Sequence, residues 1–193
     1  MKIRKYLPII SILFLSVVLM SGCSKQSTGS STSGKTLQEK TTVDTLATAK
    51  QAYNLAKKEA KNWAGDAVLV DLSNFRGSDD MSGKARKWKL EFNSVEKDKE
   101  LEVYILSGKF DDSMDQKFKE QEAISEDWID SPVAFEKAKE YFEGEEADNY
   151  WMGLTDNKGT IVWNLKCDRI EGKPLWVKLN AQTGELIETR EGY

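Results

Sequence analysis

The stretch from Ile161 to Ile187 reads IVWNLKCDRIEGKPLWVKLNAQTGELI, and it indicates the fold of the chain better than any other stretch. Apolar side chains occupy every second position of its first part and again of its second part, and a polar, glycine-containing turn separates the two. The alternating positions are Ile161, Trp163, Leu165 and Cys167, followed by Leu175, Val177 and Leu179. This period of two predicts an antiparallel hairpin that places one face on a core.

The same pattern occurs once earlier in the chain, at Trp88-Leu90-Phe92 and Leu101-Val103-Ile105. Each hairpin is preceded by apolar residues spaced three and four apart, which is typical of a helix. Asp44 is the expected N-cap of the first helix, and Ser131, followed by Pro132, that of the second. We therefore expect an α+β fold of two tandem units, residues 36–110 and 131–193, each a helix followed by three antiparallel strands.

Residues 111–130 interrupt this repeat and are expected to connect the two units. Within them, Ser113-Met114-Asp115-Gln116 matches a capping box, in which the serine and glutamine side chains bond backbone N–H groups at the start of a helix. The connector is therefore expected to contain a short helix.

The start of the chain has the pattern of an export signal. A basic beginning is followed by an apolar run that ends at Met20 and is shorter than the roughly 20 residues a membrane-spanning helix needs. Ser21-Gly22-Cys23 then resembles the bacterial lipobox, although Met20 stands where that motif usually has leucine. The resemblance implies a signal peptide over residues 1–22 and a diacylglycerol thioether on Cys23, whose acyl chains would hold the protein on a membrane. A plain cleaved signal and an uncleaved anchor are the alternatives.

Residues 23–35 contain Ser, Thr and Gly at high density and are expected to be a flexible tether behind the lipidated cysteine. Such a tether on a lipid anchor favours the extracytoplasmic face of a Gram-positive cell membrane, with a periplasmic site as the alternative. After residue 35 the chain has 23 basic and 32 acidic residues, a balance that argues against a nucleic-acid partner.

Histidine is absent from the chain, which excludes a histidine-dependent hydrolase and leaves zinc without its commonest ligand. If Cys23 carries lipid, Cys167 is the other cysteine and has no disulfide partner, so we expect it to fill space in the core. The acidic residues from Glu143 to Asp148 lack the spacing of a calcium loop and favour a solvated surface. No cofactor, metal or catalytic residue is expected.

The segment Val177 to Leu186, VKLNAQTGEL, resembles the closing strand of a PepSY-type domain, in which a hydrophobic strand runs into an Asx-Ala-x-Thr-Gly turn. The first unit departs from this pattern, because Leu106-Ser107-Gly108-Lys109 lacks most of the turn. The resemblance implies two PepSY-like units and a non-catalytic module that faces the cell envelope. Relatives of this family are thought to restrain proteases and wall-lytic enzymes.

Aromatic and apolar residues are expected on the sheet face opposite the helices, at Trp176 in the second unit and at Tyr104 and Leu106 in the first. Trp and Tyr are enriched where proteins bind partners, so this face is the candidate binding surface. The alternative is that the units or the connector cover these side chains.

These observations favour a membrane-tethered binding protein that is not an enzyme and that binds or modulates an envelope protein, such as a protease or a wall hydrolase. A module for a cell-wall glycan or small ligand, which would stack on Trp151 and Trp176, is the alternative. A glycan hydrolase that uses paired carboxylates is a third hypothesis, but no sequence pattern places two carboxylates in a shared cleft. The oligomeric state is left open.

Overall fold

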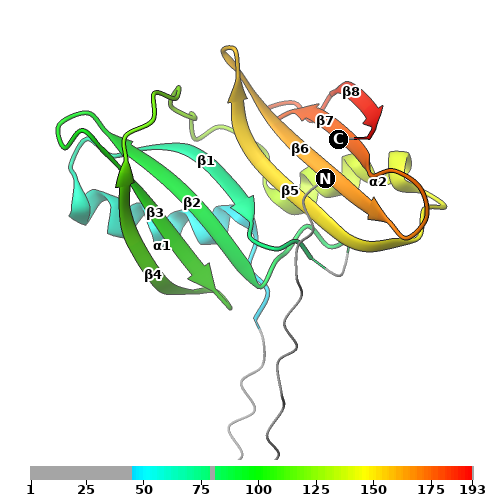
Figure 1. Ribbon diagram of the computed structural model, residues 1–193, viewed down its shortest axis with the longest axis horizontal. Coiled ribbons are helices and arrows are strands. Elements are labelled where there is room, and N and C mark those ends of the chain that lie inside the picture. Colours follow the sequence, from blue (N-terminus) through cyan, green and yellow to red (C-terminus); the bar gives the residue numbers. More distant parts are fainter. Residues whose placement is uncertain (1–44, 79–80, 193) are drawn as a thin grey trace, which may run out of the picture. The chain divides into compact units, whose positions relative to one another are not determined.

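The computed structural model of this chain describes residues 45–78 and 81–192, and the fold is that of these residues (Figure 1). They form two successive series, each a helix followed by four strands. The first series is α1 (Ala49–Trp63), β1 (Val68–Asn74), β2 (Lys87–Ser94), β3 (Lys99–Leu106) and β4 (Lys109–Lys117). The second is α2 (Ser131–Phe142), β5 (Ala147–Asn157), β6 (Thr160–Arg169), β7 (Leu175–Asn180) and β8 (Leu186–Glu191). The predicted α+β class is confirmed.

The strands of both series lie in one antiparallel sheet, in the order β4-β3-β2-β1-β5-β6-β7-β8. β1 and β5 pair at its centre, where Leu72 lies opposite Leu154 between two further residue pairs. Each series therefore forms one half of the sheet, with its first strand at the centre and its fourth strand at an outer edge. The two units expected from the sequence share a single sheet.

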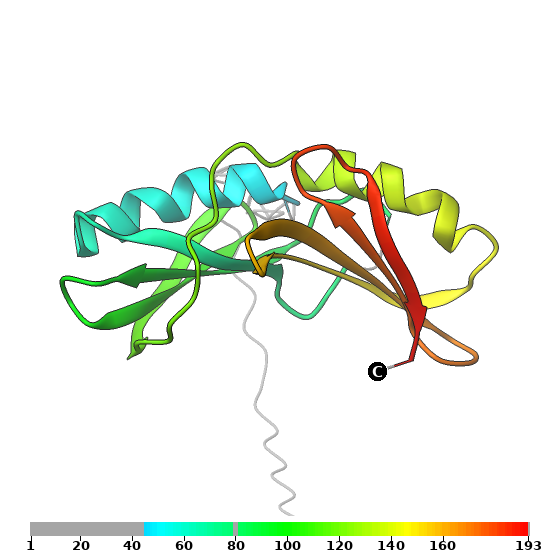
Figure 2. The same cartoon turned by 90° about the horizontal axis from the view of Figure 1, so that it is seen from above.

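Both helices lie on the same face of the sheet (Figure 2). Helix α1 packs against β2 and β3, and α2 packs against β6 and β7. The apolar residues that alternate along these strands point to the helices and form one core that runs through both halves. The opposite side of the sheet is here called the open face. It carries the polar and aromatic residues that alternate along the strands with the core residues.

Trp88 and Trp163 occupy equivalent places in the two halves, and both side chains are fully buried. The indole Nε1 of Trp88 donates to the carbonyl oxygen of Ala47 at 2.8 Å, two residues before α1 begins. The indole Nε1 of Trp163 donates to the carbonyl oxygen of Ile129 at 3.0 Å, two residues before α2 begins. Each tryptophan thus ties the second strand of its half to the start of its helix.

The expected short helix in the connector is wrong. Ser113, Asp115 and their neighbours lie in β4, which pairs along its whole length with β3. A strand pairs through its backbone, so an edge strand tolerates polar residues on both faces, and the local capping-box pattern is overridden. The same reasoning explains β8, which is exposed throughout and which the alternation did not indicate.

The beginnings of the two helices lie close together. Thr48 caps α1, and the expected N-cap Asp44 lies outside the described residues. Asp130, rather than Ser131, caps α2, and its Oδ1 also accepts the backbone N–H of Lys50 at 3.0 Å. The Ser131 hydroxyl accepts the backbone N–H of Ala49 at 2.9 Å. The start of α2 therefore satisfies two of the backbone donors that the first turn of α1 leaves free.

The expected signal peptide over residues 1–22, the lipidation site at Cys23 and the tether over residues 23–35 also lie outside the described residues. Among the residues that the structure describes, neither helix has the length and apolar character needed to span a membrane.

Candidate functional site

Two groups of side chains on the open face stand out, one on each half of the sheet. On the second half they are aromatic and cationic, and on the first half they are mostly acidic. No helix covers this face within residues 45–78 and 81–192 (Figure 2). The open face is therefore the candidate functional site.

The aromatic group consists of Trp151 on β5 and Trp176 on β7, which are both partly buried. Their ring centroids lie 5.8 Å apart with planes at 66°, an edge-to-face arrangement. Lys166 Nζ and Arg190 Cζ lie 5.5 Å and 5.3 Å from the centroid of Trp176. The indole N–H of Trp176 is buried and has no hydrogen-bond acceptor among the described residues.

Gly153 gives the Trp151 ring its place on the sheet. A Cβ added to Gly153 would lie 2.5 Å from Cη2 of Trp151, so the indole lies directly across the glycine backbone. Gly153 pairs with Ser73 of β1 on one side and with Asn164 of β6 on the other. The Trp151 indole therefore reaches the centre of the open face, beside the junction of the two halves.

Tyr104 and Leu106 lie on β3, on the other half of the open face, and are partly buried. Tyr104 packs edge-to-face on Phe75 at 5.7 Å, and Lys87 Nζ lies 4.7 Å from its centroid. Its hydroxyl donates to Glu102 Oε2 at 2.9 Å, and burial together with this bond raises the pKa of Tyr104.

The structure does not bring the four predicted residues together. Trp151 and Trp176 form one cluster, whereas Tyr104 and Leu106 lie on β3, which four strands separate from β7. At about 4.8 Å per strand, that separation is on the order of 24 Å. One small ligand cannot touch all four, but an extended partner could.

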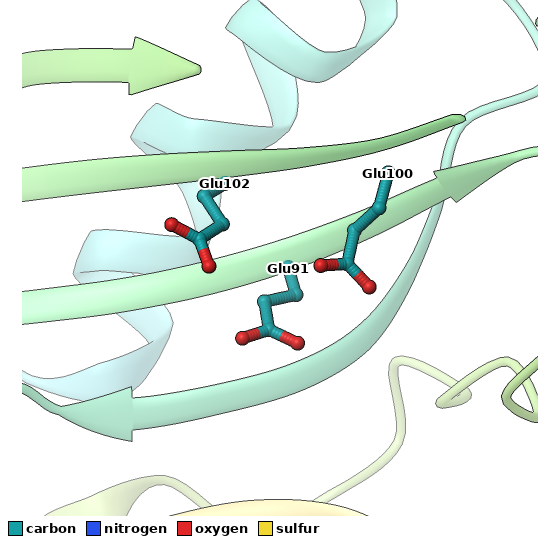
Figure 3. A group of neighbouring side chains, drawn as sticks. All are labelled: Glu91, Glu100 and Glu102. Atoms are coloured by element: carbon teal, nitrogen blue, oxygen red, sulfur yellow. The ribbon is translucent and has the colours of Figure 1, made fainter. Parts of the chain in front are cut away.

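An acidic cluster, made of Asp71 on β1, Glu91 on β2, and Glu100 and Glu102 on β3, lies on the first half of the open face. The carboxyl groups of the three glutamates point toward one another (Figure 3). Lys89 pairs with Glu91, and Lys119, from the segment after β4, lies 3.1 Å from Glu100 Oε1. This cluster was not predicted from the sequence. Its signal was a pair of charged residues at alternate positions in each of two paired strands, Lys89 and Glu91 on β2 and Glu100 and Glu102 on β3, of which Glu91 and Glu102 lie directly opposite each other.

Burial, with a smaller contribution from the neighbouring charge of Glu91, raises the pKa of Asp71 to about 7. The folded state therefore holds a proton on Asp71 over a pH range in which the unfolded chain has lost it. Stability from this group is greatest at low pH and falls as the pH rises through about 7.

We expect the wild-type protein to lose about 2–3 kcal/mol of unfolding free energy between pH 5 and pH 8 through Asp71 alone. Asp71→Asn should remove that loss and be more stable than the wild type at pH 8. Urea denaturation of both proteins at the two pH values measures the difference. Asp112→Asn, an exposed change on β4, is the control and should leave the pH dependence as it is. Equal pH dependence in the Asp71→Asn variant and the wild type would contradict the prediction.

Cys167 is fully buried on the helix side of β6, and burial raises the pKa of its thiol. A buried protonated thiol in an apolar core is a poor nucleophile. Its position agrees with the space-filling role expected from the sequence.

No protein-family model matches the chain, and no curated protein matches it. A solved structure does resemble it, that of a protein from Clostridium difficile 630 provisionally described as a lipoprotein. The two share 16% sequence identity with a TM-score of 0.56, over 72% of this chain and 91% of the other. The similarity shows a shared fold. The resemblance to PepSY-type domains stays a prediction.

Proposed function

We propose that this chain is an extracytoplasmic lipoprotein, anchored through Cys23 to the outer face of a bacterial membrane. The residues before Cys23 form an export signal with a lipobox-like end, and a protein of the same fold is provisionally described as a lipoprotein. Two acyl chains suffice for a stable anchor. The serine-rich tether suits a Gram-positive envelope, where it would carry the folded part away from the lipid surface.

The anchor predicts that Cys23→Ala abolishes lipid labelling and moves the protein from the membrane to the soluble fraction. Metabolic labelling with a radioactive fatty acid, followed by membrane fractionation, measures both effects. Cys167→Ala is the matched control and should keep the label, because the Cys167 side chain is buried in the core. Retention of unlabelled Cys23→Ala protein in the membrane would indicate an uncleaved signal anchor instead.

The folded part of this lipoprotein binds an envelope protein and performs no chemistry. The single observation that carries this proposal is the Trp151–Trp176 pair on a sheet face that no helix covers within the described residues. Tryptophans on a surface of this kind are typical centres of binding energy in protein interfaces. Lys166 and Arg190 lie against Trp176 and favour a partner segment with acidic or carbonyl oxygens. Such a partner would compete with Asp168, which pairs with Lys166 at 3.0 Å.

A protein partner fits this site better than a glycan. Sugar rings bind by stacking on an open aromatic face. The ring of Trp176 is already in contact with Lys166 and Arg190, and Trp151 packs on it edge to face. A protein partner can displace flexible cations with its own carboxylates and can offer an acceptor to the indole N–H. A protease or a wall hydrolase of the envelope is the partner class that the PepSY resemblance suggests.

Catalysis by carboxylates is disfavoured by the geometry of the acidic cluster. Glu91 and Glu100 are buried, and their oxygens lie within 4.8 Å of one another and of Glu102. Glycoside hydrolysis needs two carboxylates on opposite sides of a cleft that admits a sugar. The glutamates instead gather on one face of two paired strands, with their carboxyl groups pointing toward one another.

Photo-crosslinking in intact cells tests the binding proposal. A photoreactive amino acid at Asn164, which lines the small pocket beside Trp176 on the open face, should capture one defined protein, and the same residue at exposed Val133 on α2 should not. Replacing both Trp151 and Trp176 by alanine should reduce capture at least about tenfold while the helices stay folded. Val95→Ala, at an exposed turn, is the matched control. Retention on purified cell wall without a captured protein would favour the glycan alternative.

A further inference from the structure

The acidic cluster carries more negative charge than its neighbours neutralise. Glu91, Glu100 and Glu102 place one carboxylate oxygen each within 4.8 Å of the others, and Asp71 lies directly opposite Glu91 on the next strand. Glu100 is fully buried and Glu91 is 6% exposed. Two lysines contact these four acids among the described residues, so two negative charges remain without a counter-charge when all four are ionised.

Two buried oxygens of this cluster, Oε2 of Glu100 and Oδ1 of Asn93, have no hydrogen-bond partner in the part of the chain that the structure describes. Asn93 and Glu100 are direct partners across β2 and β3, so both side chains lie on the open face. The amide of Asn93 has a defined orientation, because its Nδ2 donates to the carbonyl oxygen of Lys119 at 2.7 Å. A neutral amide oxygen has no reason to lie unpaired beside carboxylates unless a donor or a cation joins them.

We propose that Glu91, Glu100 and Glu102, together with Asn93 Oδ1, bind a divalent cation, and that Ca²⁺ is the cation they prefer. Carboxylate and amide oxygens are the ligands of hard cations, and the cluster contains no histidine or cysteine that would favour a softer metal. Ca²⁺ accepts an irregular set of oxygens from several strands, whereas Mg²⁺ demands near-octahedral geometry and gives up water reluctantly. A divalent ion adds positive charge to a cluster whose two lysines leave it with a net negative charge.

The ammonium of Lys119 lies beside the carboxylates that would bind the cation. Its ammonium lies 3.1 Å from Glu100 Oε1 and 3.9 Å from Glu91 Oε2, yet its side chain is 57% exposed. It can therefore turn out to solvent when a cation enters. Lys89 lies deeper, at 23% exposure, and remains beside Glu91.

Asp71 lies opposite Glu91, at the border of the site. Asp71 is not needed as a ligand. The cation site is also independent of the proposed partner, since it lies on the other half of the open face from Trp151 and Trp176.

Calorimetric titration of the full-length protein in detergent, after treatment with a chelator, tests the proposal directly. Titration with CaCl₂ should show one site with a dissociation constant of about 0.1–1 mM, as in extracellular calcium modules, and weaker binding of MgCl₂. Thermal unfolding should shift upward in about 10 mM CaCl₂ relative to NaCl of equal ionic strength. The absence of both heat and shift in the wild type would overturn the proposal.

Three variants and one control locate the site. Glu100→Gln should abolish the calcium response, and Asn93→Ala should weaken it about tenfold, while thermal unfolding in chelator shows that each is folded. Glu188→Gln is the matched control, because Glu188 also pairs with a lysine on the open face, Lys178 at 3.0 Å, and it should respond as the wild type does. An equal loss in Glu188→Gln and Glu100→Gln would overturn the assignment.

The third variant, Lys119→Gln, distinguishes between two interpretations of the cluster, a cation site and a salt-bridge network that needs no metal. It removes the ammonium that competes with the ion, so calcium binding should tighten about two- to fivefold. Weaker binding in Lys119→Gln, or none, would contradict the competition and overturn the proposal.

Discussion

Trp88→Ala is expected to lower the free energy of unfolding by about 4 kcal/mol, a large share of what holds a small domain folded. The Trp88 indole is fully buried between α1 and the sheet, so its removal leaves a cavity that the surrounding core cannot fill. The change also removes the 2.8 Å hydrogen bond from the indole to the carbonyl oxygen of Ala47, which keeps its bond from the backbone N–H of Ala85. Chemical denaturation followed by far-ultraviolet circular dichroism measures the loss.

Two further variants separate the contributions. Trp88→Phe keeps most of the ring volume but not the N–H, and it should cost about 1–2 kcal/mol. Trp163→Ala should cost as much as Trp88→Ala, because Trp163 is equally buried and bonds Ile129 in the corresponding way. Val95→Ala, at a side chain that is 79% exposed, should change stability by less than about 0.5 kcal/mol. A loss below about 1 kcal/mol in Trp88→Ala would contradict the role given to this residue.

Asn74→Ala is expected to weaken the junction between the two halves of the sheet. Asn74 is fully buried at the end of β1, where its Nδ2 donates to Tyr150 O at 3.0 Å and its Oδ1 accepts from Met152 N at 2.8 Å. Without the amide, the backbone N–H of Met152 loses its acceptor, at a cost of about 1–3 kcal/mol, while Tyr150 O keeps the bond from the backbone N–H of Ser78 at 2.8 Å. With the lost bond to Tyr150 O added, we expect a total loss of about 2–4 kcal/mol.

The location of Asn74 predicts a second effect, on cooperativity. The β1–β5 pairing comprises three residue pairs, the shortest junction in the sheet, so its weakening should let the halves unfold in separate steps. Calorimetry should show a broader or double transition in Asn74→Ala. Asn157→Ala, at an exposed turn of the same strand β5, should leave one transition. A single sharp transition with unchanged midpoint in Asn74→Ala would sink this prediction.

Much of the fold could be predicted from local patterns. The period-two runs through Trp88 and Trp163 identified hairpins and the face that each buries, because alternation in a strand directly reports which side meets the core. The spacing of apolar residues identified both helices. The helix starts were misplaced, since Thr48 and Asp130 cap helices whose beginnings depend on one another across the fold.

The outer strands and the joining of the two halves could not be predicted in this way. Strands β4 and β8 are held by backbone pairing at the sheet edges, where the side chains face water on both sides and carry no alternation. Whether β1 meets β5 depends on the fit of two strands far apart in the chain, which neither strand's own residues reveal.

The candidate site was predicted only in part. Alternation indicated which aromatic residues share the open face, but their grouping into a Trp151–Trp176 pair and a separate Tyr104 depends on strand order. The acidic cluster was missed altogether. Glu91 and Glu100 read as ordinary solvated charges in the sequence, and they are buried because the strand pairing and the segment around Lys119 enclose them.

The sequence by itself determined the α+β class, the two helices and the buried side of each hairpin, because these follow from the periodicity of neighbouring residues. Only the tertiary structure decided that the two halves share one sheet, that Asn74 joins them, and that the glutamates converge on one buried place. Those features arise from pairings between segments distant in the chain. Their energies depend on which groups are removed from water together, and the order of neighbouring residues in the sequence does not indicate which distant groups these are.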